Sequence, residues 1–236
     1  MRAAIAAGLA VLVLAGCGGG ERETVPASRL AAAAEATRDA PSERVHVAIA
    51  VNAFATDVHV AGDGVFDNRR GDGRMTLDMS DAAGLAGAPG AERADVIARG
   101  GAVWIRWAPF AQRLGADRPW VRFDAEPLAL VTHGLRGLKG DAEVVGQETV
   151  RGTPTTRYTT KVDPRRYGNL PVGGDEVPVD VWVAGASGRV SRVRVKAPVS
   201  IPNGPGFDLD VTVELYDFGA PVGHVVPPPA SAAVRR

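Results

Sequence analysis

Cysteine is almost absent from this 236-residue sequence, in which Cys17 is the only one. A single cysteine cannot close a disulfide within the chain and cannot form a cysteine-rich metal site. Net charge is absent as well, because 27 basic residues balance 27 acidic ones. This neutrality gives no reason to expect nucleic acid or an anionic surface as a partner.

Long apolar runs are also missing, with one exception at the N-terminus. Arg2 supplies a short positive region, and residues 3–15 are apolar without interruption. This run is short for a hydrocarbon core of about 30 Å and is typical of the central region of a signal peptide. No later run approaches membrane length, so we expect the rest of the chain to lie outside the bilayer.

The apolar run ends in four residues that resemble the bacterial lipobox, Leu14-Ala15-Gly16-Cys17. Lipobox processing removes residues 1–16 as a signal peptide and attaches diacylglycerol to the sulfur of Cys17. Two acyl chains, at about 0.8 kcal/mol per buried methylene, make such an anchor effectively permanent. We therefore expect a palmitate-type lipid anchor on the extracytoplasmic face of the plasma membrane. The alternative is an ordinary secretory signal with a chance cysteine.

The mature chain divides into three parts. In residues 17–26, three glycines follow Cys17 and there is no apolar periodicity, which indicates a flexible tether. Residues 27–225 are long enough for one domain with a substantial core. Residues 226–236 contain three consecutive prolines and predict an extended tail.

Two helices are expected in the domain. Residues 27–39 are strong helix formers, and Pro41 ends them. A second helix over 127–138 begins with a proline and has one apolar stripe. The stripe consists of Leu128, Val131, Leu135 and Leu138.

Strands account for most of the remaining chain. Residues 45–51 alternate apolar and polar or small side chains, and a second strand begins at Asp57 after a loop over 53–56. A hairpin is expected over 96–107, because Gly100 and Gly101 easily adopt the positive φ of a tight turn. The expected register pairs Val51 with Val58, Ile49 with Val60, His46 with Asp63, Ala98 with Val103 and Val96 with Ile105. Further strands are expected at 74–79, 119–124, 142–150, 154–162, 178–184, 188–196 and 207–217.

These patterns predict an α+β fold with about ten antiparallel strands and two or more helices. Short strands joined by close turns favour a sandwich or a barrel. Two helices cover only part of the apolar face of such a sheet, which favours a half-open barrel with a groove. A Gly- and Pro-rich segment over 164–177 indicates a loop or lid.

Catalytic and metal-binding patterns are not found in the sequence. The four histidines, His46, His59, His133 and His224, lack zinc-ligand spacing. No serine lies in a Gly-x-Ser-x-Gly turn, and no glycine-rich loop joins a strand to a helix as a phosphate site requires. Asp208 and Asp210 share a strand face, where an exposed polar surface is the simpler interpretation than a cation site. We expect a non-enzymatic protein without metal or cofactor.

Several segments resemble the LppX/LprAFG family of actinobacterial lipoproteins, which is similar in fold to the LolA carriers. Besides the lipobox, the matching segments are Trp104 with 119–124, and the stretches 144–150, 155–158, 179–183 and 215–222. They follow the family's order over most of the mature chain. The resemblance implies a half-barrel of antiparallel sheet wrapped on helices, with an apolar cavity for the acyl chains of a lipid or lipoglycan.

The predicted function is therefore lipid binding for local transfer or presentation in the cell envelope. Methionine adapts to irregular ligands, so Met75 and Met79 suit a cavity wall together with Leu77. Leu128, Val131 and Leu135 suit the facing wall. Ordinary core packing is the alternative for all six residues. The alternative function is a scaffolding or protein-binding envelope lipoprotein with a filled core.

Overall fold

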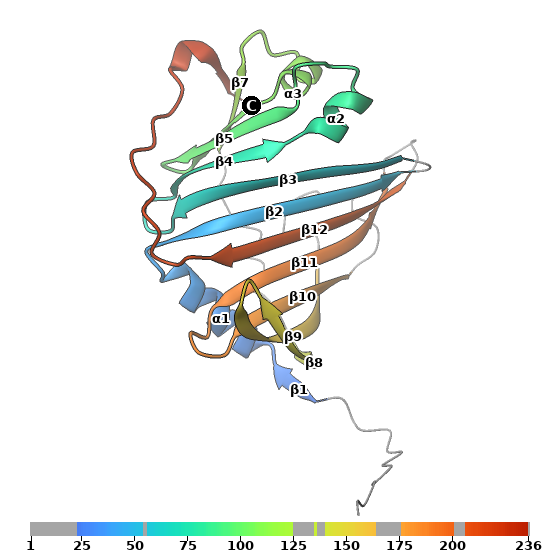
Figure 1. The fold of residues 1–236 in the computed structure, drawn as a ribbon, viewed down its shortest axis with the longest axis vertical. Helices are drawn as coiled ribbons and strands as arrows, with labels where there is room; N and C mark the ends of the chain where they lie inside the picture. Colours follow the sequence, from blue (N-terminus) through green and yellow to red (C-terminus); the bar gives the residue numbers. More distant parts are fainter. Residues whose placement is uncertain are drawn as a thin grey trace, which may run out of the picture.

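The fold is a single curved and unclosed sheet, with helices at one face and at one end (Figure 1). The computed structural model describes residues 23–53, 56–124, 135, 140–163, 176–200 and 206–235. Within these residues it contains thirteen strands and three α-helices. The sheet order is β1-β8-β9-β10-β11-β12-β2-β3-β4-β5-β6-β7-β13, and every described pair is antiparallel except β7 with β13.

The strands vary in length from three to twelve residues. They are β1 (Thr24–Pro26), β2 (Ser42–Ala53), β3 (Thr56–Asp67), β4 (Asp72–Asp78), β5 (Arg93–Arg99), β6 (Ala102–Arg106), β7 (Trp120–Asp124), β8 (Asp141–Val150), β9 (Thr153–Val162), β10 (Val177–Ala184), β11 (Val190–Val199), β12 (Phe207–Tyr216) and β13 (Ala233–Arg235). The long central strands β2, β3 and β12 form the middle of the sheet (Figure 1).

Helix α1 (Ser28–Arg38) confirms the first predicted helix and covers the apolar face of the sheet at one end. Its buried side chains are small apart from Leu30, so the helix backbone can approach the strands closely. Thr37 joins it to β11: the hydroxyl donates to Ala33 O at 2.8 Å and accepts from the amide of Val190 at 2.8 Å. The face beneath α1 is called the inner face below, and the opposite face the outer face.

The predicted registers are confirmed. Strands β2 and β3 pair Val51 with Val58, Ile49 with Val60 and His46 with Asp63. Strands β5 and β6 pair Val96 with Ile105 and Ala98 with Val103, with φ of 56° at Gly100 and 77° at Gly101. Strands β2 and β3 are longer than predicted. Ala53 and Thr56, the first and last residues of the expected four-residue loop, pair with each other and so belong to the strands.

The predicted number of strands was too low, and two short helices were missed. The three-residue strands β1 and β13 are too short to show a period in the sequence. Helices α2 (Ser80–Leu85) and α3 (Ala108–Arg113) have six residues each, which is less than two turns. The strand predicted over 74–79 ends at Asp78, so Met79 is wrongly placed there: it is the N-cap residue of α2.

The C-terminal segment ends in a short strand, β13, which joins the edge of the sheet. Residues 219–229 have no helix or strand, and a 3-10 turn over Ala230–Ala232 leads into β13. Strand β13 pairs in parallel with β7, placing Val234 beside Val121. Figure 1 shows this segment passing along the strand ends from β12 to β7. The predicted helix over 127–138 lies outside the described residues except for Leu135, and the segment 164–175 lies outside them altogether.

Candidate functional site

The inner face consists of rows of apolar side chains that cross the sheet. One row runs from Leu215 on β12 through Val45, Met75 and Val96, because directly paired residues point to the same side. The next rows contain Val47 with Val213, and then Ile49 with Val211 and Val60. This face is the candidate functional site.

Burial along the inner face changes from one end of the strands to the other. Near α1, Val45, Leu215 and Val193 are buried in the hydrophobic core cluster. Farther along the same strands, Ile49 and Val51 on β2 are only half-buried. Val58 and Val60 on β3, and Leu209 on β12, are half-buried as well. The inner face therefore combines a packed end with an apolar end that retains accessible surface.

Two glycines shape the middle of this face. Gly62 and Gly64 lie on the inner side of β3, opposite Leu77 and Met75 of β4. A Cβ atom on Gly62 would lie 2.1 Å from Thr76 O, and one on Gly64 would lie 2.7 Å from Arg74 O. The absence of side chains at both positions lets β4 approach closely here, which supports the curvature of the sheet.

The predicted wall residues lie mainly at the packed end. Met75 is 9% exposed and Leu135 is 2% exposed, and both belong to the core cluster. Leu77 packs against that cluster, whereas Met79 is half-buried beside α2. Leu128 and Val131 lie outside the described residues, as do Leu14, Ala15, Gly16 and Cys17.

The inner face also holds one buried carboxylate, Glu43. Its Oε2 accepts a hydrogen bond of 2.7 Å from Asn68 Nδ2, while Oε1 has no hydrogen-bond partner among the described residues. Burial raises the pKa of Glu43 to about 7, and the Asn68 bond and the charge of Arg189 oppose this rise. The same Asn68 amide donates to Ala40 O at 3.2 Å, so this cluster joins the end of α1 to β2.

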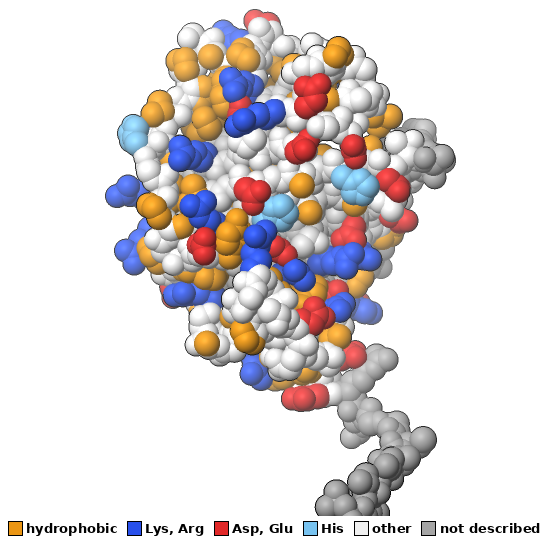
Figure 2. Space-filling model, in the orientation of Figure 1, with side chains coloured by type: hydrophobic (Ala, Val, Ile, Leu, Met, Phe, Trp, Pro, Cys, Tyr) orange, Lys and Arg blue, Asp and Glu red, His pale blue; other side chains and the backbone are white. Residues whose placement is uncertain are grey.

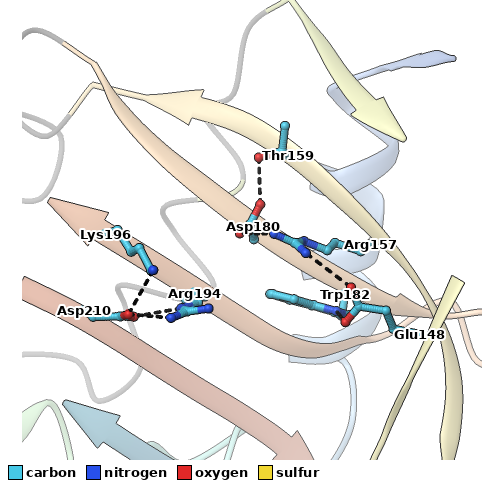
Figure 3. Close-up of polar contacts among 8 residues, drawn as sticks. All are labelled: Glu148, Arg157, Thr159, Asp180, Trp182, Arg194, Lys196 and Asp210. Carbon is cyan, nitrogen blue, oxygen red and sulfur yellow. Dashed lines mark hydrogen bonds and ion pairs between the residues drawn. The ribbon is translucent and has the colours of Figure 1, made fainter. Parts of the chain in front are cut away.

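The outer face, in contrast, has interleaved basic and acidic side chains (Figure 2). Arg157 donates to Asp180 at 2.9 Å and to Glu148 at 3.3 Å, and Thr159 donates to Asp180 at 2.7 Å (Figure 3). Asp210 accepts from Arg194 at 2.6 Å and pairs with Lys196 at 3.5 Å (Figure 3). These hydrogen bonds hold the pKa of Asp210 below its ordinary value despite partial burial.

Trp182 lies between two arginines of this outer network. The guanidinium carbons of Arg157 and Arg192 are 5.1 and 5.2 Å from the ring centroid, and the indole N–H donates to Glu148 at 2.7 Å. The ring is thereby occupied by protein groups, which agrees with cross-strand packing of this tryptophan. Asp210, considered above for a cation site, is likewise engaged by basic side chains.

The described residues contain no helix long and apolar enough to cross a membrane. They also contain no group of three or more His, Cys, Asp or Glu side chains arranged to hold a metal ion. The outer network was not predictable from local patterns in the sequence, because its partners come from different strands; Arg151 and Glu214 are 63 residues apart. Charged residues at alternate positions of β11 and β12 were the sequence signal that could have predicted a charged outer face.

Comparison with known proteins addresses the fold. No protein-family model and no curated protein sequence matches the chain. Among solved structures, LprF from Mycobacterium bovis aligns with a TM-score of 0.50 and 16% identity, covering 86% of this chain and 96% of LprF. The chain has the LppX/LprAFG-like fold. The lipoprotein LppX from Mycobacterium tuberculosis also aligns, with a TM-score of 0.48 and 16% identity over 85% of this chain and 97% of LppX.

The LppX/LprAFG-like fold confirms the predicted class of architecture and corrects its details. The curved, unclosed sheet of the prediction is present, with thirteen strands in the described residues instead of about ten. Within this fold the packed core lies at the α1 end of the inner face. The half-buried apolar residues at the other end keep accessible surface.

Proposed function

We propose that this protein is a non-enzymatic envelope lipoprotein that holds acyl chains of a lipid or lipoglycan against its inner face. The observation that carries the proposal is the half-buried row of Ile49, Val51, Val58 and Val60, which continues the core beyond α1. The fold shared with LprF supports the same class of protein.

The energetics of such a site follow from apolar burial. A methylene that leaves a bilayer loses about 0.8 kcal/mol of burial, which the protein surface must restore. A face that restores most of this energy makes loading and unloading nearly neutral. From Val45 to Val51 on β2 and from Val58 to Phe66 on β3, every inner-facing position is apolar or glycine, and these stretches offer such a face.

The remaining predicted wall residues complete the proposal. Met75, Leu77 and Leu135 close the packed end, where the acyl chain would terminate. Leu128 and Val131 are proposed for the facing wall, and Met79 for the rim beside α2. Cys17 is proposed as the lipidated residue, with Leu14, Ala15 and Gly16 as the recognition sequence before it.

A pair of neighbouring substitutions tests acyl binding. Ile49 and Ala48 are adjacent on β2 but point to opposite faces. We expect Ile49→Asp to weaken binding of a fluorescent fatty-acyl probe by about tenfold or more, because a carboxylate is costly to bury without a partner. Ala48→Asp introduces the same charge on the outer face and is expected to bind the probe as the unaltered chain does.

Native mass spectrometry of the purified chain adds a direct measurement. We expect lipid to copurify with the unaltered chain and with the Ala48→Asp variant, and to be depleted from Ile49→Asp. A chain that purifies empty and binds no acyl probe would refute the proposal. It would favour the filled-core scaffold instead, for which cross-linking in cells should capture a protein partner.

A further inference from the structure

A recess lies on the outer face, across β2 to β7, on the side of the sheet opposite the inner-face site. It has a volume of about 460 Å³ and is lined by four arginines and two aspartates among other residues. The charged lining residues are Arg44, Arg74, Arg93, Arg106, Asp63 and Asp95. Four positive and two negative side chains give this recess a net charge of +2.

The two aspartates of the recess are already engaged. Asp95 accepts from Arg106 Nε at 2.9 Å and from Arg93 at 3.3 Å. Despite partial burial, these two arginines hold the pKa of Asp95 below its ordinary value. Asp63 pairs with His46 at 3.0 Å and accepts from the Tyr216 hydroxyl at 3.3 Å. Asp95 is therefore already paired with two arginines of the recess, whereas Asp63 is held by His46 and Tyr216.

Arg74 is the exposed arginine of the recess that has no carboxylate partner among the described residues. It makes no ion pair with any residue that the structure describes, whereas Arg157, Arg192 and Arg194 on the same face are each paired with a carboxylate. Arg74 and Arg44 flank Val65 from the two neighbouring strands, and Arg44 Nε forms an exposed ion pair of 3.4 Å with Asp217. Two strand spacings separate their backbones by about 10 Å. Long guanidinium side chains at this separation can converge on one bound group.

The floor of the recess is apolar. Val65 is only 7% exposed although it points to the outer face, and Ile97 lies beside Arg74 in the same cross-strand row. The Arg106 guanidinium lies 5.2 Å from the centroid of the Trp120 ring at the far wall. Apolar surroundings strengthen the attraction between a guanidinium and an anion. Figure 2 shows several basic side chains in the upper part of this face, with acidic ones among and beside them.

We propose that this recess binds a phosphate-bearing group, with the phosphate on Arg74 and, shared with Asp217, on Arg44, and with the adjoining glycerol or sugar on Val65, Ile97 and Trp120. Guanidinium groups match phosphate oxygens with paired hydrogen bonds, which favours phosphate as the anion. The group can belong to a lipid head group or to a soluble phosphate ester. This inference does not depend on acyl binding at the inner face.

Isothermal titration of the full chain in dodecyl maltoside tests the recess. The probes are sn-glycerol 3-phosphate, micelles doped with dioleoyl phosphatidate, and micelles doped with dioleoylglycerol as the phosphate-free control. We expect Arg74→Gln to weaken binding of both phosphate probes by about tenfold or more, since hydrogen bonds to charged groups are among the stronger ones. Arg70→Gln removes the same charge from an exposed turn outside the recess and is expected to bind normally.

Comparison of the probes identifies the source of the phosphate. Similar affinities for both phosphate probes would support a soluble ester, and markedly tighter binding of phosphatidate would support a lipid head group. The Ile49→Asp variant is expected to retain glycerol 3-phosphate binding, which separates this recess from the inner face. Absence of binding by both phosphate probes, or equal affinities of Arg74→Gln and Arg70→Gln, would overturn the inference.

Discussion

Single residues on the inner face show how costly a misplaced charge is in this fold. Most of the inner face near α1 is hydrocarbon, yet Glu43 lies there fully buried with one hydrogen bond to its carboxylate. A group with a folded-state pKa of about 7 binds its proton more strongly in the folded chain than in the unfolded chain, where the pKa is 4.5. Ionisation of Glu43 therefore costs no stability below about pH 4.5, where both states are protonated; the cost grows between pH 4.5 and about 7 and is constant above that.

Glu43→Gln should remove this dependence. A shift from 4.5 to about 7 corresponds to an upper value of about 3 kcal/mol in the free energy of unfolding above pH 7. We expect the variant to gain about 1–3 kcal/mol over the unaltered chain at pH 8 and to differ little at pH 4.5. Urea unfolding at the two pH values measures the difference.

Glu176→Gln provides the control, because Glu176 is exposed and its ion pair with Lys161 at 3.3 Å is a surface one. Exposed pairs of this kind contribute about 0–1 kcal/mol. A gain by Glu43→Gln that is the same at both pH values would contradict the assignment of the cost to ionisation.

At the scale of elements, the short strand β13 closes one edge of the sheet. Without it, β7 would present its unpaired backbone groups to solvent, which invites association with other chains. The segment before β13 is held along its course: Arg99 donates to Val225 O at 2.8 Å, and the amide of Gly219 donates to Ser42 O at 2.8 Å. Arg118 donates to Ala230 O and Ala233 O at 3.2 and 3.1 Å.

Deletion of residues 230–236 should therefore have two effects. We expect unfolding free energy to fall by about 1–2 kcal/mol, from the loss of a few hydrogen bonds and the ion pair of Arg235 with Asp124. We also expect concentration-dependent association through β7. Chemical denaturation and size-exclusion chromatography measure the two effects.

The matched control lies in the same segment. Val226 is exposed, so Val226→Ser should change neither stability nor oligomeric state. A truncated chain that remains as stable and as monodisperse as this control would show that β13 contributes nothing to the edge.

At the scale of the whole molecule, the proposed anchor restricts what a carrier can do. A chain held by two acyl chains at Cys17 stays on its own membrane, because about 0.8 kcal/mol per methylene opposes its release. It can extract a lipid locally and pass it to a receiver within reach, or hold it for presentation. Free diffusion between membranes is not available to such a protein.

Cys17→Ala tests the anchor. We expect the variant to lose labelling by an alkynyl fatty acid in cells and to accumulate as a precursor that retains residues 1–16. Gel mobility and click detection report both changes. Gly20→Ala, three residues farther along the same segment, should be labelled and processed normally. Undiminished labelling of the Cys17→Ala variant would exclude Cys17 as the lipidated residue.

The sequence by itself determined the features that depend on neighbours along the chain. The registers of β2 with β3 and of β5 with β6 follow from the period of two and the length of each turn, so Val51–Val58 and Val96–Ile105 were predictable. The helical character of α1 follows from local propensity in the same way. The half-barrel architecture was predicted from the family resemblance, which rests on short segments that follow one another in the family's order.

Only the tertiary structure decided which distant residues meet. Pairing of β12 with β2, and of β13 with β7, joins segments that no local pattern links. The same long-range pairing buries Glu43, neutralises Arg192 with Glu214, and leaves Arg74 unpaired above Val65. Charge balance and burial are set by neighbours across strands, and a linear sequence does not specify these neighbours until the sheet order is known.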